Sequence, residues 1–145
     1  MQNFHPLFVH FPIALILSAL LLDMLGLMCQ RPGLHDVALW NLSLGTLGAG
    51  AAVLTGLQAE EMAKHSFEIW KVMELHEKLG ITTLIIGAVV VGLRWWMRNR
   101  LSTPARMLMM LGALAMACTV GFGAYLGGRL VYEFGVGGLF GVPPR

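Results

Sequence analysis

The chain has 145 residues, of which 57% are hydrophobic and only 12% are charged, and its mean hydropathy is +0.70. This composition excludes a soluble globular domain and predicts an integral membrane protein. A net charge of +2 with scattered arginines excludes a nucleic-acid-binding surface. Such charges are better suited to setting the orientation of the chain in a bilayer. The two cysteines, Cys29 and Cys118, form neither a disulfide framework nor a C-x-x-C-H motif, so any haem would be held by ligands alone.

The first apolar run begins with two histidines and two prolines in residues 5–12, HPLFVHFP. No positively charged segment precedes this run and no small-residue cleavage site follows it, so we expect a retained helix and not a signal peptide. A helix over 6–28 is roughly 34 Å long, which is enough to cross a hydrocarbon core of about 30 Å. Pro12 has no N–H to donate, which predicts a kink beside His10.

Hydropathy and glycine punctuation predict three further spans, at about 37–57, 76–97 and 107–126. Residues 30–36 are interpreted as a short turn. The expected fold is therefore all-α, a single integral membrane four-helix bundle over residues 1–145. Many glycines and alanines in the second span would let a neighbouring helix or a flat cofactor approach the backbone closely.

Two local patterns add detail to this bundle. Between the second and third spans, residues 58–78 are charged but carry Ala63, Phe67, Trp70 and Met73 at steps of four, three and three. This spacing predicts a short amphipathic helix lying in the membrane interface. Before the fourth span, Ser102 or Thr103 is suited to cap the helix.

The distribution of cations predicts the orientation in the bilayer. Each side has five: Arg31, Arg94, Arg98, Arg100 and Arg106 on one, and Lys64, Lys71, Lys78, Arg129 and Arg145 on the other. Four of the first group crowd one short connection, so we expect that side to be cytoplasmic. The protein would then lie in the inner membrane of a bacterium with both termini periplasmic.

Two histidines then lie at similar depth near the outer face. His10 is about 6 Å below the start of the first helix, and His76 opens the third span. Two imidazoles from different helices of a small bundle are what a b-type haem with two histidine ligands requires. The sequence therefore predicts haem b bound through His10 and His76.

Other residues would complete such a site. Gly56 and Gly80 would give a ring plane room to approach, and Arg129, Lys71 and Tyr132 would reach haem propionates. Ordinary interfacial histidines explain the same pattern, and that alternative stays open.

The remaining titratable residues receive plainer interpretations. His5 and His65 are expected to support the ligands or to bind another metal, and His35 is interpreted as part of a loop. Asp23, inside the first span, could relay protons or face a quinone headgroup, but a structural pairing with Arg31 or the interface is favoured.

Four segments resemble a widespread bacterial family of predicted four-helix membrane proteins catalogued as a domain of unknown function. They are residues 5–15, residues 54–57 (LTGL), His76 and residues 124–132 (AYLGGRLVY). The resemblance covers essentially the whole chain, and it implies four helices and a redox setting, because similar domains occur beside Rieske and cytochrome c modules. The family positions that map onto this chain are His5, His10, Pro12, His76, Gly127, Gly128 and Tyr132.

Taken together, these observations predict an electron-transfer subunit that links a membrane quinol pool to a periplasmic redox partner. No phosphate-binding loop, serine nucleophile motif or HExxH pattern indicates a stand-alone enzyme. Two alternatives remain: a cofactor-free anchor for a larger redox complex, and a small non-haem metal site that collects His5, His10, His76 and Glu77. A transporter is disfavoured because four short-looped spans show no repeat.

Overall fold

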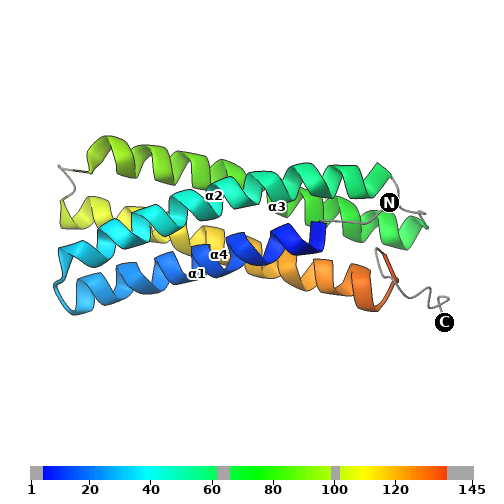
Figure 1. The fold of residues 1–145 in the computed structure, drawn as a ribbon, viewed down its shortest axis with the longest axis horizontal. Coiled ribbons are helices and arrows are strands. Elements are labelled where there is room, and N and C mark those ends of the chain that lie inside the picture. Colours follow the sequence, from blue (N-terminus) through cyan, green and yellow to red (C-terminus); the bar gives the residue numbers. More distant parts are fainter. Residues whose placement is uncertain (1–4, 62–65, 99–101, 137–145) are drawn as a thin grey trace.

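The computed structural model describes residues 5–61, 66–98 and 102–136, and it folds them into four helices. These are α1 (His5–Met28), α2 (Pro32–Glu61), α3 (Phe67–Met97) and α4 (Thr103–Tyr132). Figure 1 shows them side by side along one long axis, with α1 and α2 forming one hairpin and α3 and α4 forming a second. α1 packs against α2 and α4, and α3 packs against the same two helices, so α1 and α3 lie across the diagonal of the bundle. The predicted four-helix bundle is confirmed.

All four helices are long and apolar enough to cross a membrane. Their outer surfaces carry large apolar side chains, including Leu47 at 71% and Trp96 at 81% exposure. In water such surfaces would be unstable, whereas in a bilayer they contact lipid. The chain is therefore a multi-pass membrane protein.

Local sequence signals define the helix ends. Gln30 has a positive φ of 54°, and the N–H of Arg31 donates to the carbonyl of Gly26 at 3.0 Å, which is the bond of a Schellman cap. Ser66 caps α3 through the N–H of Ile69, and Ser102 caps α4, as one of the two predicted candidates.

Two expected boundaries are wrong. α2 begins at Pro32 and not near residue 37, because proline is well suited to the first turn of a helix. The charged stretch 58–78 does not form a separate interfacial helix within the part of the chain that the structure describes. Its first residues belong to α2, and Phe67 onward belongs to α3, since no proline separates the Ser66 cap from Met97.

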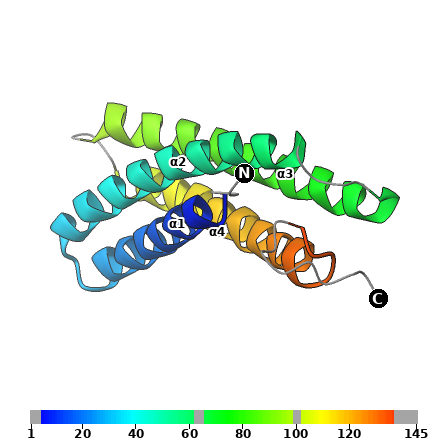
Figure 2. The same cartoon turned by 45° about the vertical axis from the view of Figure 1, so that its right-hand side comes forward.

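The main cluster of buried apolar residues lies in one half of the bundle. The cluster of buried apolar residues around Ile16, Leu42 and Met116 lies in the half that contains the α1–α2 connection. Toward the other end, α1 begins well short of the ends that α2, α3 and α4 reach, and α3 and α4 diverge, as Figures 1 and 2 show. Because α1 does not extend as far as its neighbours at this end, its first residue, His5, lies among the other helices and not at the tip of the bundle.

Candidate functional site

A cavity of about 520 Å³ occupies the end of the bundle where α1 begins. This volume is in the range of cofactor and ligand sites, roughly 300–1,000 Å³. All four helices line it, and its wall includes most of the residues predicted from sequence as a cofactor site: His10, His76, Gly56, Gly80 and Tyr132.

His76 is held in the cavity by α4. Its Nδ1 lies 2.8 Å from the carbonyl oxygen of Gly123, and because a carbonyl only accepts, Nδ1–H is the donor. Gly127 lies against the same ring, since a Cβ added there would be 3.2 Å from Cε1 of His76. In the neutral ring the lone pair is therefore on Nε2.

His5 is held in a matching way by α2. Its Nδ1 lies 3.2 Å from the hydroxyl oxygen of Thr55, and a Cβ added at Gly56 would lie 3.1 Å from Cε1 of His5. Burial lowers the pKa of His5 below its usual 6.5, and a positive charge on His76 lowers it further, while the Ala52 carbonyl opposes both effects. The ring is therefore favoured in its neutral form.

The rings of His5 and His76 lie next to each other across the diagonal of the bundle. Their centroids are 6.1 Å apart and their planes are nearly perpendicular, at 88°. His5 is bonded within the α1–α2 hairpin and His76 within the α3–α4 hairpin. Contact between the two rings thus crosses the seam between the hairpins.

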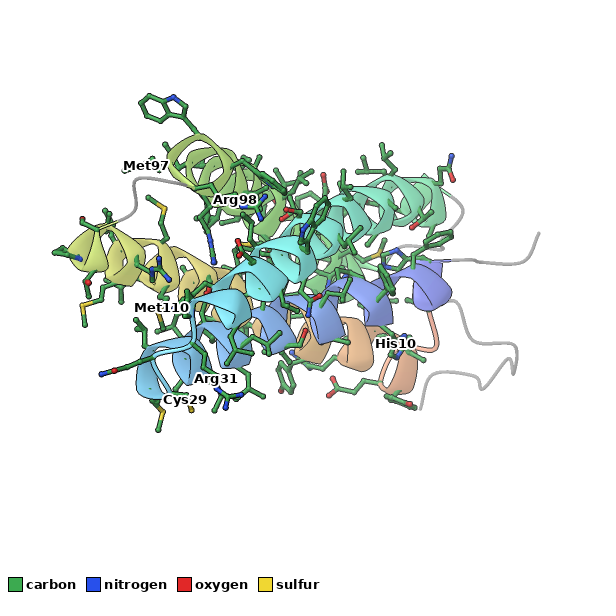
Figure 3. The ribbon with its side chains drawn as sticks, turned by 60° about the vertical axis from the view of Figure 1, so that its left-hand side comes forward. His10, Cys29, Arg31, Met97, Arg98 and Met110 are labelled. Carbon is green, nitrogen blue, oxygen red and sulfur yellow. The ribbon has the colours of Figure 1, made fainter. Side chains whose placement is uncertain are left out.

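His10, the predicted partner of His76, also lines the cavity but is an exposed residue. Figure 3 shows it at the opposite end of the bundle from Cys29 and Arg31. Five residues along a helix are about 140° out of phase, so His5 and His10 project from different sides of α1. The first-helix ring that lies next to His76 is that of His5.

The residues expected at haem propionates are spread more widely. Arg129 forms an ion pair with Glu133 at 2.8 Å, and Nζ of Lys71 lies 4.7 Å from the Phe67 ring centroid. Neither residue lines the cavity, whereas Tyr132 does. His65 lies outside the described residues.

The small metal site predicted as an alternative is not assembled as a cluster. Among the described residues, no group of three or more histidine, cysteine, aspartate or glutamate side chains is close enough to hold a metal ion. His5, His10, His76 and Glu77 share the cavity wall without forming such a group.

A second polar cluster lies at the opposite end of the bundle, within the half that holds the main apolar cluster. Asp23 is fully buried, and its two carboxylate oxygens accept from Arg94 at 2.5 and 2.9 Å. His35 Nδ1 lies 2.8 Å from the same carboxylate, and the His35 carbonyl also accepts from Arg94. This cluster connects α1, α2 and α3.

The cluster corrects two expectations. His35 is a buried residue of α2 and not part of a loop, and the partners of Asp23 are Arg94 and His35 in place of Arg31. The sequence does contain a signal for Arg94: it is a cation three residues inside the end of an apolar run, where it is costly unless paired with an intramembrane acid. Nothing comparable marks His35, because its burial depends on the helix starting at Pro32.

The fold and the cavity define a four-helix membrane protein with two histidines next to each other inside the bundle. Residues 1–139 match the family described as a predicted membrane protein, DUF2231, and the chain belongs to that family. No curated protein and no solved structure matches the chain.

Proposed function

We propose that the cavity holds one b-type haem between His5 and His76 and that the chain is a membrane electron-transfer subunit. The observation that carries this proposal is the adjacent pair of imidazoles, each with its Nδ1 engaged by a neighbouring helix. Histidines that bind metals commonly have one ring nitrogen fixed by a hydrogen bond in this way, which orients the ring and makes it a stronger ligand.

The separation of the rings suits a shared metal. A metal–imidazole bond is about 2.0 Å, as at zinc, and the ring centre lies roughly 1 Å beyond the nitrogen, so two imidazoles on opposite sides of one metal have centres about 6 Å apart. The centroids of His5 and His76 are 6.1 Å apart. Ordinary packing of two aromatic rings reaches the same separation, so the surroundings must decide between a ligand pair and a packed pair.

Those surroundings favour a flat cofactor over a bare ion. Gly56 and Gly127 leave room for the two imidazole rings, which a Cβ at either position would crowd, and the cavity wall also contains Gly80, Gly123 and Gly128. A cavity of about 520 Å³ around the rings is far larger than a single ion needs. The donor set of two imidazoles in a largely apolar site is the set that b-type haem takes up.

A haem bound in this way would supply one-electron exchange at its iron. With His5 and His76 both holding the iron, no ligand position would be left for a substrate, which favours electron transfer over bond-making chemistry. We propose a membrane quinol as the donor, which becomes quinone as it loses two electrons and two protons. The two electrons would pass one at a time through the haem to two molecules of a one-electron periplasmic redox protein, and the two protons would be released to water on the periplasmic side. The proposal places the chain in an inner membrane with both termini periplasmic, and it is supported there by the crowding of arginines in one short connection.

The direct test is titration of the purified, detergent-solubilised apoprotein with ferric haem, followed by visible absorption. We expect saturation at one haem per chain and the spectrum of a six-coordinate low-spin haem that dithionite reduces. As a ligand control, His5→Ala should lose that spectrum and regain it when imidazole is added. Absence of saturable binding would exclude the haem site, and stoichiometric copper, zinc or iron without porphyrin in the purified protein would favour a bare metal.

A further inference from the structure

The hydroxyl of Thr55 lies between His5 and the backbone of its own helix. It is 2.9 Å from the carbonyl oxygen of Ala51 and 3.1 Å from that of Ala52, and it is 3.2 Å from Nδ1 of His5. The same hydroxyl oxygen can therefore donate a hydrogen bond to a carbonyl and accept one from the histidine ring. Thr55 belongs to the LTGL segment at residues 54–57, next to Gly56, which lies against the same histidine ring.

The direction of these hydrogen bonds follows from the proton count. A hydroxyl has one hydrogen and two lone pairs. If that hydrogen pointed at His5, the lone pairs of Thr55 would face the two carbonyl oxygens, which is repulsive. The hydrogen therefore goes to the carbonyls of Ala51 and Ala52, and the oxygen accepts from Nδ1–H of His5.

We infer that Thr55 is a positioning residue for the cavity: by accepting from Nδ1–H it holds His5 in the tautomer whose Nε2 carries the lone pair. This inference rests on the proposed haem site, where that nitrogen would be the ligand atom. The carbonyl of Gly123 accepts from Nδ1–H of His76 in the same way and leaves the lone pair of that ring on Nε2. The same tautomer is thus favoured on both rings by two different helices: α2 contacts His5 through the Thr55 hydroxyl and also through the Ala52 carbonyl, and α4 contacts His76 through the Gly123 carbonyl.

Thr55→Val tests the inference because it keeps the shape of the side chain and removes the acceptor. Loss of a group that holds the second nitrogen of a ligating histidine typically weakens metal binding about 10- to 100-fold. We expect haem affinity to fall by such a factor, part of the spectrum to change from low-spin to high-spin, and the reduction potential to rise, because a less electron-rich imidazole stabilises ferric iron less. Thr55→Ser, which keeps the hydroxyl, should restore all three properties.

Thr46→Val is the matched control. Thr46 is on the same helix and donates to the carbonyl of Leu42 at 2.8 Å, but it does not line the cavity. It should retain the haem affinity, spin state and potential of the unsubstituted protein. If Thr55→Val does not accumulate in membranes, Thr55→Cys is compared with Thr55→Ser in its place, because a thiol is a weak acceptor of similar size.

The outcomes separate this inference from the proposed function. If the unsubstituted protein binds no haem, the proposed site is excluded and the role of Thr55 with it. If it binds haem and Thr55→Val or Thr55→Cys behaves as Thr46→Val and Thr55→Ser do, the site stands and the role of Thr55 is excluded. Weaker binding with an unchanged spin state and potential would also overturn it, because that result would indicate a general packing defect.

Discussion

The two glycines that face the histidine rings are the smallest features on which the proposed site depends. At Gly127 an added Cβ would lie 3.2 Å from Cε1 of His76, closer than ordinary van der Waals contact. The ring would have to move by a few tenths of an ångström, and its 2.8 Å hydrogen bond to Gly123 would be disturbed. A displacement of this size matters more to a coordinated metal than to the stability of the helix.

Gly127→Ala should therefore weaken haem binding roughly 10-fold or more, in the range seen when a ligand's supporting contacts are disturbed, while leaving the protein folded. Gly121→Ala on the same helix is the control, because an added Cβ there meets no atom within 4 Å. Haem titration of both variants measures the difference. Equal affinities would show that His76 is not a ligand or that the ring tolerates the shift.

At this scale the sequence predicted part of the site. It identified His76 and the glycines Gly56 and Gly80 as residues of one site, and all three line the cavity. It favoured His10 over His5 because His5 was interpreted as the residue before the helix. That choice depended on depth along α1 alone. The position of His5 among the other helices depends instead on where α1 begins relative to the ends of its neighbours, which the sequence does not reveal.

The helices are held together across the diagonal by a few polar side chains. Arg94 of α3 reaches Asp23 of α1 with both partners almost fully buried. Removing one member of such a pair leaves an uncompensated buried charge and typically costs about 3–5 kcal/mol, whereas replacing both members with apolar residues is often near neutral.

We therefore expect Arg94→Met to lower the free energy of unfolding by about 3–5 kcal/mol and Asp23→Leu combined with Arg94→Met to recover much of that loss. Arg98→Met is the control, since its ion pair with Asp36 is exposed and exposed pairs contribute about 1 kcal/mol or less. Thermal or denaturant unfolding in detergent measures all three. A double variant as unstable as Arg94→Met alone would show that the buried pair contributes more than charge compensation.

The existence of the four helices could be predicted from sequence because each contains a long apolar run between capping or turn residues. Their full lengths could not, because hydropathy detects the lipid-facing part of a helix and not its polar extensions. α3 continues from Phe67 through the charged residues before the apolar run, and α2 begins among polar residues at Pro32. The Asp23–Arg94 pairing was missed because it joins residues 71 positions apart.

Considered as a whole, the molecule has its main apolar cluster toward one end and a cavity toward the other. The same two diagonal helices, α1 and α3, are connected through Asp23 and Arg94 in the half with the main apolar cluster and through the His5–His76 ring contact at the cavity. A group coordinated by both imidazoles would therefore join the two hairpins at the cavity.

The most direct test of this account is the reduced-minus-oxidised visible spectrum of the purified protein, recorded in parallel for His5→Ala, His76→Ala and His10→Ala after expression with added haem. The account predicts a low-spin haem spectrum in the unsubstituted protein and in His10→Ala, and its loss in His5→Ala and His76→Ala. A spectrum that persists in His5→Ala and disappears in His10→Ala would contradict the assignment of the ligands. A colourless unsubstituted protein would contradict the haem site itself.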